Sequence, residues 1–191
     1  MTYLVDKLTK LANQSYCAVK KTSPMIEEVK YYTGELLRLS EHRQSVLEEM
    51  VTLAQSLPEY EILHSIPGIA ETTATSIIRE LGDIRRFHSA NQINVFIGID
   101  LRHYKSGNFL AKEYITKRGN PYARKILFKC IHNIASAVHT NPCHIADFYK
   151  KRKRQSQVTS TKPRTIVSIH CLIRTMYYLI THNKLYDYTS T

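Results

Sequence analysis

The chain has no tryptophan, and only six glycines and six prolines occur among its 191 residues. An all-β fold needs many turns, which glycine and proline form best, so this low content argues against a sandwich or barrel. No apolar run approaches the ~20 residues that span a membrane. The N-terminal MTYLVDKLTK has charges inside its apolar pattern, unlike a signal peptide. The sequence therefore predicts a globular protein that is not bound in a membrane.

Paired cysteines are also lacking. The four cysteines, at positions 17, 130, 143 and 171, contain no CxxC motif, so we expect reduced, mostly buried thiols of an intracellular protein. His139, Cys143 and His144 lie close together in the sequence, but no fourth ligand stands at a suitable spacing. The sequence therefore does not predict a zinc site.

Positive charge, in contrast, is abundant and localised. Lysine and arginine number 27 against 16 acidic residues, for a net charge of +11. Residues 102–125 hold seven Lys/Arg against one Glu, or +6, and residues 150–164 hold seven and no acid, or +7, which leaves −2 for the rest of the chain. Two concentrated basic segments indicate a polyanion-binding surface. The alternative is a solvated basic face plus a basic loop.

Residues 26–57 have the pattern of one long helix. Apolar residues recur in steps of three and four, interrupted only by Arg43: Val29, Tyr32, Leu36, Leu39, Val46, Met50, Leu53 and Leu57. A heptad sustained over about four repeats is typical of a coiled coil. Residues 4–18 carry a shorter version, and Ser23-Pro24 between the two predicts a helix N-cap and first helical position.

The region 1–57 is therefore expected to be a coiled-coil arm, formed as an antiparallel hairpin or as a dimerising arm. A surface helix packed on its own domain is the alternative, because coiled-coil seams and core faces look alike over short lengths. Residues 58–191 are expected to form a compact helical domain, so the predicted fold class is mainly α.

The start of this domain, EILHSIPGIAETTATSIIRELG, predicts a helix-hairpin-helix. Pro67-Gly68 makes a tight turn, and a second helix follows over 72–81. The first backbone N–H groups of such a helix lack intrahelical partners and can donate to a phosphate oxygen, which holds DNA without reading its sequence. We expect Ile69, Ala70 and Glu71 to offer these groups, although the usual motif has Gly where this chain has Ala70. The alternative is a hairpin that merely packs.

Further helices are predicted over 122–138, 144–154 and 165–181, with a helix or short strand over 89–98. The KRGN sequence at 117–120 predicts a turn before a helix, and QSQVTSTKPR at 155–164 predicts a loop. The last ten residues are expected to fray.

The stretch YKSGN at 104–108 places a hydroxyl among cations. A serine needs activation to act as a nucleophile, and attack on a phosphodiester needs cations where charge builds up. Gly107 would let a phosphate approach the backbone. Residue types alone leave two roles open for Ser106: phosphate binding, or strand exchange through a covalent phosphoserine link. The nearby cations are Arg102, Lys105, Lys112, Lys117, Arg118 and Arg124.

The order of six motifs over about residues 60–181 resembles one family: IPGI, GDIRRF, G-x-x-L-R-x-x-x-S-G, KRGN-P-x-x-R, DFYKKRKR and TIVSIHCLIRTMYYLI. This is the C-terminal transposase domain of the insertion-sequence family known as IS-one-ten, related to the Piv DNA invertases. No single motif is specific, but the six in this order are. One departure is that Leu101 stands where the family has Pro after its Gly-Leu-x.

The resemblance implies that Ser106 attacks DNA during transposition and that a structured guide RNA directs the recombination. Candidate DNA-binding residues are Gly68, Ile69, Ala70, Arg102, Lys105, Gly107, Lys117, Arg118, Asn120, Arg124, Lys151, Arg152, Lys153 and Arg154. The implied partners are DNA and guide RNA, and the heptad pattern of the arm predicts a second copy of the chain as a further partner. The implied location is the prokaryotic cytoplasm, at the nucleoid.

In that family a carboxylate domain resembling RuvC comes first and binds the divalent metal, and nothing before residue 60 matches it. We therefore expect no metal or other cofactor in this chain and no catalysis by the chain alone, which would be a fragment or the remnant of a decayed element. Two other functions stay open. One is a non-catalytic helix-hairpin-helix module that binds nucleic acid, with Tyr149 available to stack on a base. The other is a helical interaction protein whose charge is incidental.

Overall fold

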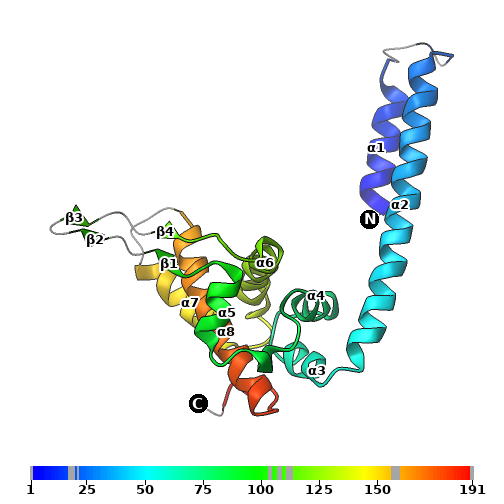
Figure 1. Cartoon of the computed structure of the whole chain (residues 1–191). Coiled ribbons are helices and arrows are strands. Elements are labelled where there is room, and N and C mark those ends of the chain that lie inside the picture. The colour runs from blue at the N-terminus through cyan, green and yellow to red at the C-terminus, as the bar shows by residue number, and fades with distance from the viewer. Residues whose placement is uncertain are drawn as a thin grey trace. The chain divides into compact units, whose positions relative to one another are not determined.

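The computed structural model describes residues 2–16, 20, 22–102, 105–106, 109–110, 114–155 and 160–189. These residues contain eight α-helices, one 3₁₀ helix and four strands of two residues each (Figure 1). The prediction of a mainly α fold is confirmed. The chain divides into two compact units, Met1–Val46 and Leu47–Thr191.

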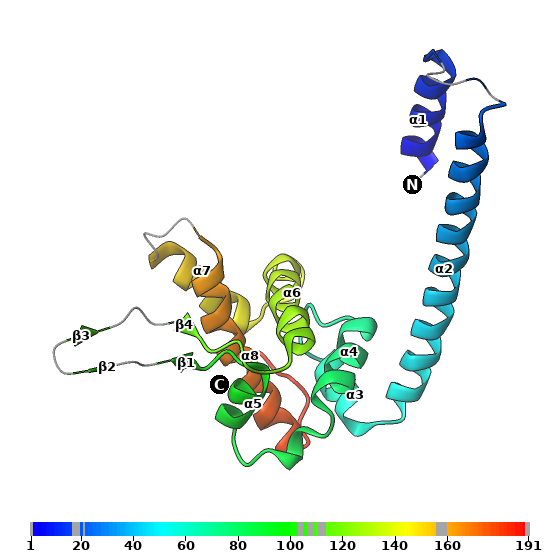
Figure 2. The ribbon, with the colours of Figure 1, turned by 45° about the horizontal axis from the view of Figure 1, so that its top comes forward.

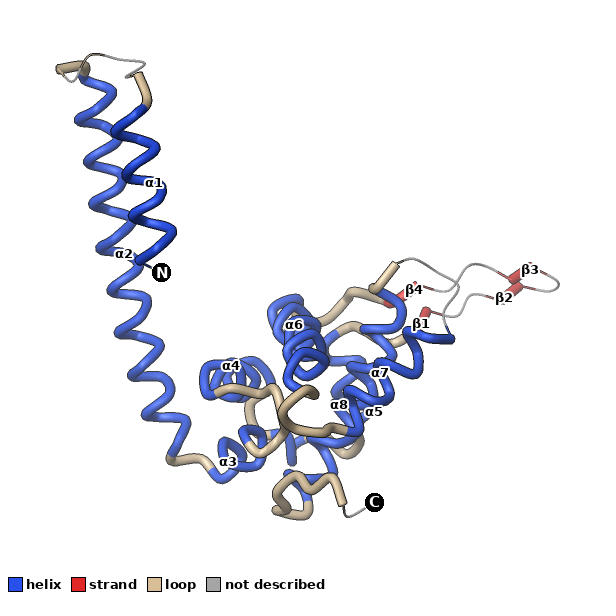
Figure 3. The backbone as a smooth tube through the Cα atoms, turned by 180° about the vertical axis from the view of Figure 1, so that it is seen from behind, coloured by secondary structure: helices blue, strands red, loops and turns tan. Residues whose placement is uncertain are grey.

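The first unit contains α1 (Thr2–Gln14) and the first part of α2 (Pro24–Gln55), which run antiparallel (Figures 1 and 3). Helix α2 begins at Pro24, as the Ser-Pro signal predicts, because proline needs no N–H partner at the first helical position. Most heptad side chains of α2 are exposed, although Met50 is half-buried: Val29 keeps 64% of its surface accessible and Leu36 68%.

The second unit packs around α8 (Lys162–Thr181), whose buried residues recur in the helical pattern of three and four: Ile169, Leu172, Ile173, Met176 and Ile180. Helix α8 contacts α3 (Pro58–His64), the 3₁₀ helix η1 (Ile84–Arg86), α5 (Ala90–Ile97), α6 (Pro121–Ala137) and α7 (His144–Gln155). Helix α4 (Glu71–Leu81) packs on α3 and α6. Figure 2 shows these helices grouped around α8.

Along the chain, two short antiparallel ladders follow α5 and precede α6. Strand β1 (Leu101–Arg102) pairs with β4 (Tyr114–Ile115), and β2 (Lys105–Ser106) pairs with β3 (Phe109–Leu110). The sequence of residues 101–115 gives no strand signal, because each strand has only two residues and two residues cannot show an alternating pattern. Gly107-Asn108 separates the paired Ser106 and Phe109, and a two-residue Gly-Asn step is a known hairpin signal.

The end of the chain departs from the expected frayed tail. The Tyr186 N–H donates to Ser65 Oγ at 2.8 Å, and its hydroxyl accepts from the His144 N–H at 2.9 Å. The Tyr188 hydroxyl donates to Asp147 Oδ2 at 3.1 Å. The prediction of fraying is wrong for residues 184–189, because the Tyr186 backbone bonds Ser65 at the end of α3 and the side chains of Tyr186 and Tyr188 bond residues of α7.

No helix within the described ranges is long and apolar enough to cross a membrane.

Candidate nucleic-acid interface

The turn between α3 and α4 has the signature of a type II β-turn. Pro67 stands at its second position and Gly68 at its third, with φ +89°, and the Ile69 N–H donates to the Ile66 carbonyl at 3.0 Å. A Cβ on Gly68 would lie 2.6 Å from the Ile134 Cα. Only glycine therefore combines this φ with such a close approach to α6.

This turn corrects one detail of the predicted phosphate site. The Ile69 N–H is not free, because it closes the turn, and the Ile69 side chain is buried. Ala70 is the N-cap residue of α4 and is exposed. The N–H groups of Ala70 and Glu71 have no acceptor among the described residues. The groups that a phosphate oxygen can reach are therefore those that follow Ile69.

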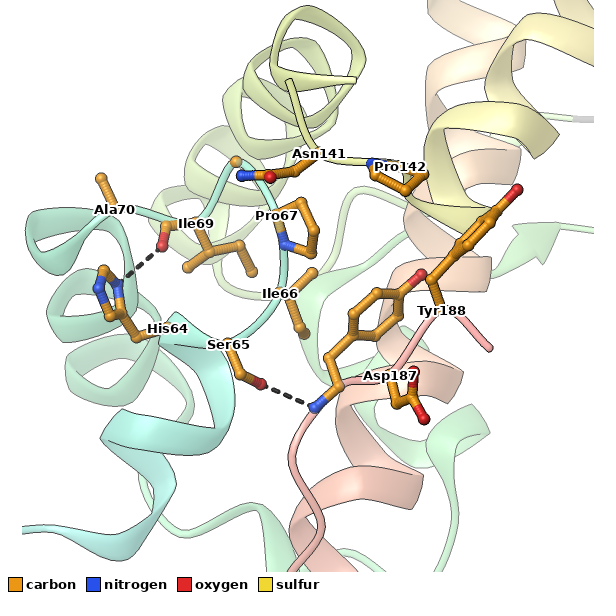
Figure 4. A pocket seen from close by; sticks show the side chains of 12 residues that line it. His64, Ser65, Ile66, Pro67, Ile69, Ala70, Asn141, Pro142, Asp187 and Tyr188 are labelled. Carbon is orange, nitrogen blue, oxygen red and sulfur yellow. Dashed lines mark hydrogen bonds between the residues drawn. The ribbon is translucent and has the colours of Figure 1, made fainter. Parts of the chain in front are cut away.

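A pocket of about 610 Å³ adjoins the turn (Figure 4). Its walls are residues 64–70, Asn141-Pro142 and the C-terminal residues 186–188. His64 Nδ1 lies 3.1 Å from the Ile69 carbonyl, and Ser65 contacts the Tyr186 N–H, as the dashed lines in Figure 4 show. The turn is thus supported from both sides.

The segment that carries Ser106 has a hydrogen-bonded base. The Thr116 hydroxyl donates to Asp100 Oδ1 at 2.6 Å, and the Thr116 N–H donates to the Asp100 carbonyl at 3.0 Å. The Lys117 N–H donates to the Gly98 carbonyl, also at 3.0 Å. Together with the β1–β4 ladder, these bonds hold both ends of segment 101–115 side by side.

Ser106 lies in β2, opposite Phe109, and the structure describes its backbone alone. The same holds for Lys105 in β2 and Arg102 in β1. Gly107 lies outside the described residues. The β2–β3 ladder lies farther from the helices than the β1–β4 ladder (Figures 1 and 2).

Two residues of the KRGN-P-x-x-R motif, Asn120 and Arg124, have a structural role. Asn120 is the N-cap of α6, its Oδ1 accepting from the N–H groups of Tyr122 and Ala123 at 2.9 and 3.1 Å, and its Nδ2 donates to Glu80 Oε2 at 2.8 Å. Arg124 Nη1 donates to the Ile97 carbonyl at the end of α5, at 2.7 Å. Both side chains are thereby engaged within the protein. Lys117 and Arg118 are exposed, so they are the cations of this motif that a polyanion can reach.

We expect Asn120→Ala to destabilise the domain by about 2 kcal/mol in urea unfolding at neutral pH, because α6 loses its cap and Glu80 loses a donor. Asn120→Asp keeps the capping oxygen but cannot donate to Glu80, so it separates the two effects. An unfolding free energy unchanged in Asn120→Ala would contradict the capping role.

The dependence of stability on pH should test the hydrogen bond between Asn120 and Glu80. The Asn120 amide, with a smaller contribution from Arg79, lowers the pKa of Glu80 below its ordinary value. The ionised Glu80 therefore adds stability above its ordinary pKa, and this stability is lost as the pH falls through the lowered folded pKa. In Asn120→Ala the acid-induced loss should be smaller than in the unmodified chain, as urea unfolding at neutral and acidic pH would show.

The basic end of α7 is exposed along its whole length. Lys151, Arg152, Lys153 and Arg154 all face solvent, and the Arg152 guanidinium lies 5.3 Å from the centre of the Phe148 ring. The expectation that Tyr149 stacks on a base is wrong. Tyr149 is only 8% exposed and packs edge-on against His132, because the helical phase of α7 directs it into the core.

The two basic segments lie toward the same end of the second unit. In all three views the end of α7 and the start of α8 lie beside β1 and β4 (Figures 1, 2 and 3). The end of α7, which carries the cations of residues 150–154, and the β1–β4 ladder at the base of the segment with Ser106 therefore lie toward the same end. Among the described residues no group of three or more His, Cys, Asp and Glu side chains is arranged to hold a metal ion.

The sequence did not indicate three polar residues near the base of the segment that carries Ser106: His170, Asp100 and Thr116. His170 of α8 is half-buried and hydrogen-bonds the backbone of Ile99, and burial lowers its pKa below the ordinary value. Asp100 and Thr116 form the base described above. Sixteen residues separate this pair, and no local signal joins them.

Comparisons with known proteins show what this sequence is similar to. Residues 60–150 match the model of the transposase IS116/IS110/IS902 family, a range that runs from α3 into α7. This match and the relatives described next confirm the family resemblance that the order of motifs predicts.

The chain is 37% identical over 93 residues to the transposase for insertion sequence element IS1111A of Coxiella burnetii, covering 49% of this chain and 26% of the relative. It is 28% identical over 166 residues to the pilin gene-inverting protein of Moraxella bovis, covering 83% of this chain and 50% of the relative. The transposase for IS1328 of Yersinia enterocolitica is 28% identical over 117 residues, covering 57% of this chain and 35% of the relative. The chain thus spans half or less of the length of these relatives.

Proposed function

We propose, on the premise that residues 60–150 form a transposase domain of the IS116/IS110/IS902 family, that this chain is the C-terminal part of a DNA transposase or recombinase. In this proposal it binds DNA, and a structured guide RNA, at the basic end of its second unit. It supplies Ser106 as the nucleophile for strand exchange. The gathering of both basic segments and the Ser106 strand at one end of the domain is the observation that carries the proposal.

The chemistry needs such a gathering. A phosphodiester under attack gains negative charge on its nonbridging oxygens, and preorganised cations stabilise that charge. Lys117, Arg118 and the α7 cations are exposed, so they are free to contact the backbone around the attacked phosphate. The N–H groups of Ala70 and Glu71 would hold a second phosphate in the manner of a helix-hairpin-helix. Such contacts position DNA without reading its bases.

A divalent metal would be held by a carboxylate domain that the family resemblance places before this region. The role of Ser106 is to form a bond from its Oγ to phosphorus while the 3′ or 5′ oxygen of the broken strand leaves. The phosphoserine link keeps the energy of the broken bond for rejoining.

Ser106→Ala should leave nucleic-acid affinity nearly unchanged and abolish the covalent protein–DNA adduct in an enzyme completed with the carboxylate domain. The reason is that the substitution removes the attacking oxygen and no charge. Denaturing electrophoresis of labelled DNA would detect the adduct. An adduct that persists in Ser106→Ala would exclude this serine. Ser89→Ala, outside the basic segments, is the matched control and should form the adduct normally.

We further propose that the arm self-associates through the exposed α2 seam, as a coiled coil with a second copy. Leu36 and Leu39 are more than half exposed, and a heptad seam buries such residues against a partner helix. Leu36→Lys should shift the molecular mass in sedimentation equilibrium from oligomer to monomer, because it places a charge in the seam. Arg38→Gln, which removes a charge on the same helix, should not. Equal masses for Leu36→Lys and the unmodified chain would contradict the proposal.

A further inference from the structure

We propose that the exposed face of α8, with the adjoining C-terminal segment, binds an unpaired nucleotide of a single-stranded nucleic acid. This inference deepens the proposed function and rests on it. It concerns four residues, called here the α8 stripe: His170, Arg174, Tyr178 and His182.

The α8 stripe follows from helical spacing. Its residues stand four apart, so each lies one turn beyond the last on nearly the same face. The buried residues of α8 lie on the other side. At one end of the stripe, His170 contacts the Ile99 backbone next to Asp100, and Asp100 starts the segment with Ser106. The stripe therefore begins at the base of the serine segment and runs along α8 to its C-terminal end.

The far end of the stripe offers an aromatic surface held in place. The rings of Tyr178 and His182 are stacked, with centroids 4.3 Å apart and planes 30° apart. His182 Nδ1 also lies 2.9 Å from the Tyr178 carbonyl. Tyr178 nevertheless keeps 50% of its surface exposed. A base that stacks on this ring meets a surface already ordered, and stacking on aromatic side chains is how proteins hold single strands without a sequence preference.

Two cations stand beside this ring. Arg174, Tyr178 and Lys184 line a pocket of about 430 Å³ between α8 and the C-terminal segment. Among the described residues, the side chains of Arg174 and Lys184 form no salt bridge and no hydrogen bond, while the Lys184 backbone N–H donates to the Leu179 carbonyl at 2.9 Å. One carboxylate, Asp187, also lines the pocket, and its Oδ1 accepts from the Thr189 N–H and hydroxyl. The pocket thus holds two available positive charges next to an exposed ring.

This combination fits an unpaired nucleotide better than a duplex. A duplex buries the faces of its bases in its own stack and offers only phosphates and groove edges. A nucleotide in a single strand offers a phosphate and a free base face together, which match the cations and the ring of the pocket. The volume of the pocket is that of a small-molecule site, so a double helix cannot enter it.

The test uses the whole chain and measures binding of short oligothymidine, oligouridine and duplex DNA by fluorescence anisotropy. We expect Arg174→Gln and Tyr178→Ala each to weaken single-strand binding about tenfold and duplex binding less than twofold. Lys129→Gln removes one exposed charge from α6 and is the matched control for Arg174. Tyr178→Phe keeps the ring and should bind as the unmodified chain does. Comparison of oligothymidine with oligouridine shows whether the strand is DNA or RNA.

A second readout is spectroscopic. An oligonucleotide with 2-aminopurine should lose fluorescence on binding through stacking on Tyr178, and the loss should disappear in Tyr178→Ala. The inference is overturned if Arg174→Gln binds single strands as Lys129→Gln does, or if duplex and single-strand affinities fall equally. A different result would overturn the proposed function itself: duplex DNA would not bind at all, or its affinity would not depend on the salt concentration. Circular dichroism confirms that each variant is folded.

Discussion

Replacing Lys151, Arg152, Lys153 and Arg154 together by glutamine is expected to weaken duplex DNA binding several-hundred-fold at about 0.1 M salt. All four side chains are exposed at the end of α7. At about 1 kcal/mol for each lost phosphate contact, four contacts amount to about 4 kcal/mol. The same variant should show a salt dependence whose slope is lower by about 3 to 4, because four fewer counterions are released on binding.

The control for this experiment keeps the charge and changes the side chains. Exchanging each lysine for arginine and each arginine for lysine at the same four positions preserves the charge. It should change the affinity by less than about threefold, since phosphate contacts carry no sequence information. Anisotropy titrations over a range of salt concentrations measure both quantities. An unchanged slope in the glutamine variant would show that α7 does not contact DNA.

Gly119→Ala is expected to destabilise the second unit by about 3 kcal/mol or more, since a methyl group cannot be accommodated without moving the backbone. A Cβ at this position would stand 2.2 Å from the Phe96 carbonyl oxygen and 2.5 Å from the Gly98 nitrogen. Both neighbours are backbone atoms at the end of α5, so no side chain can rotate away. The substitution should therefore also disturb the base of the segment that carries Ser106.

Gly34→Ala is the matched control for this prediction. Gly34 lies within α2, and nothing stands within 4 Å of the position its Cβ would take. Alanine there should stabilise the helix by about 0.5–1 kcal/mol. Urea unfolding of both variants, followed by circular dichroism, measures the difference. Similar stabilities for Gly119→Ala and the unmodified chain would show that the close contact of α5 with the 117–120 turn is not required.

Several structural features follow from local sequence. Pro24 and Pro121 stand at the first positions of α2 and α6, where proline costs no hydrogen bond. Gly98 is the left-handed C-cap of α5, with φ +71°, as its place after an apolar run indicates. The Pro67-Gly68 pair also carried enough information to show that the Ile69 N–H is engaged, because a type II turn bonds its first and fourth residues.

The candidate site was less predictable. Phe148 and Tyr149 are adjacent aromatics in a basic helix, and only the packing of α7 shows that Tyr149 is buried against His132 while Phe148 meets Arg152. Asn120 reads equally well as a phosphate contact and as a helix cap. Its oxygen accepts from the N–H groups of Tyr122 and Ala123, which assigns it to the second role, and its amide also donates to Glu80, forty positions earlier. Tyr186 and Tyr188 lie in a tail whose composition resembles a disordered end, yet both find partners across the domain.

By itself, the sequence determined the mainly α class, the two basic segments and the family resemblance that the comparisons confirm. It could do so because helix starts, helix ends and charge runs depend on residues within a few positions of one another. The tertiary structure alone decided that the two basic segments share one end with Ser106, that Asn120 and Arg124 bond within the protein, and that α8 presents a stripe beside a charged pocket. These depend on contacts between residues far apart in the chain, and such contacts leave no periodic signal in the sequence.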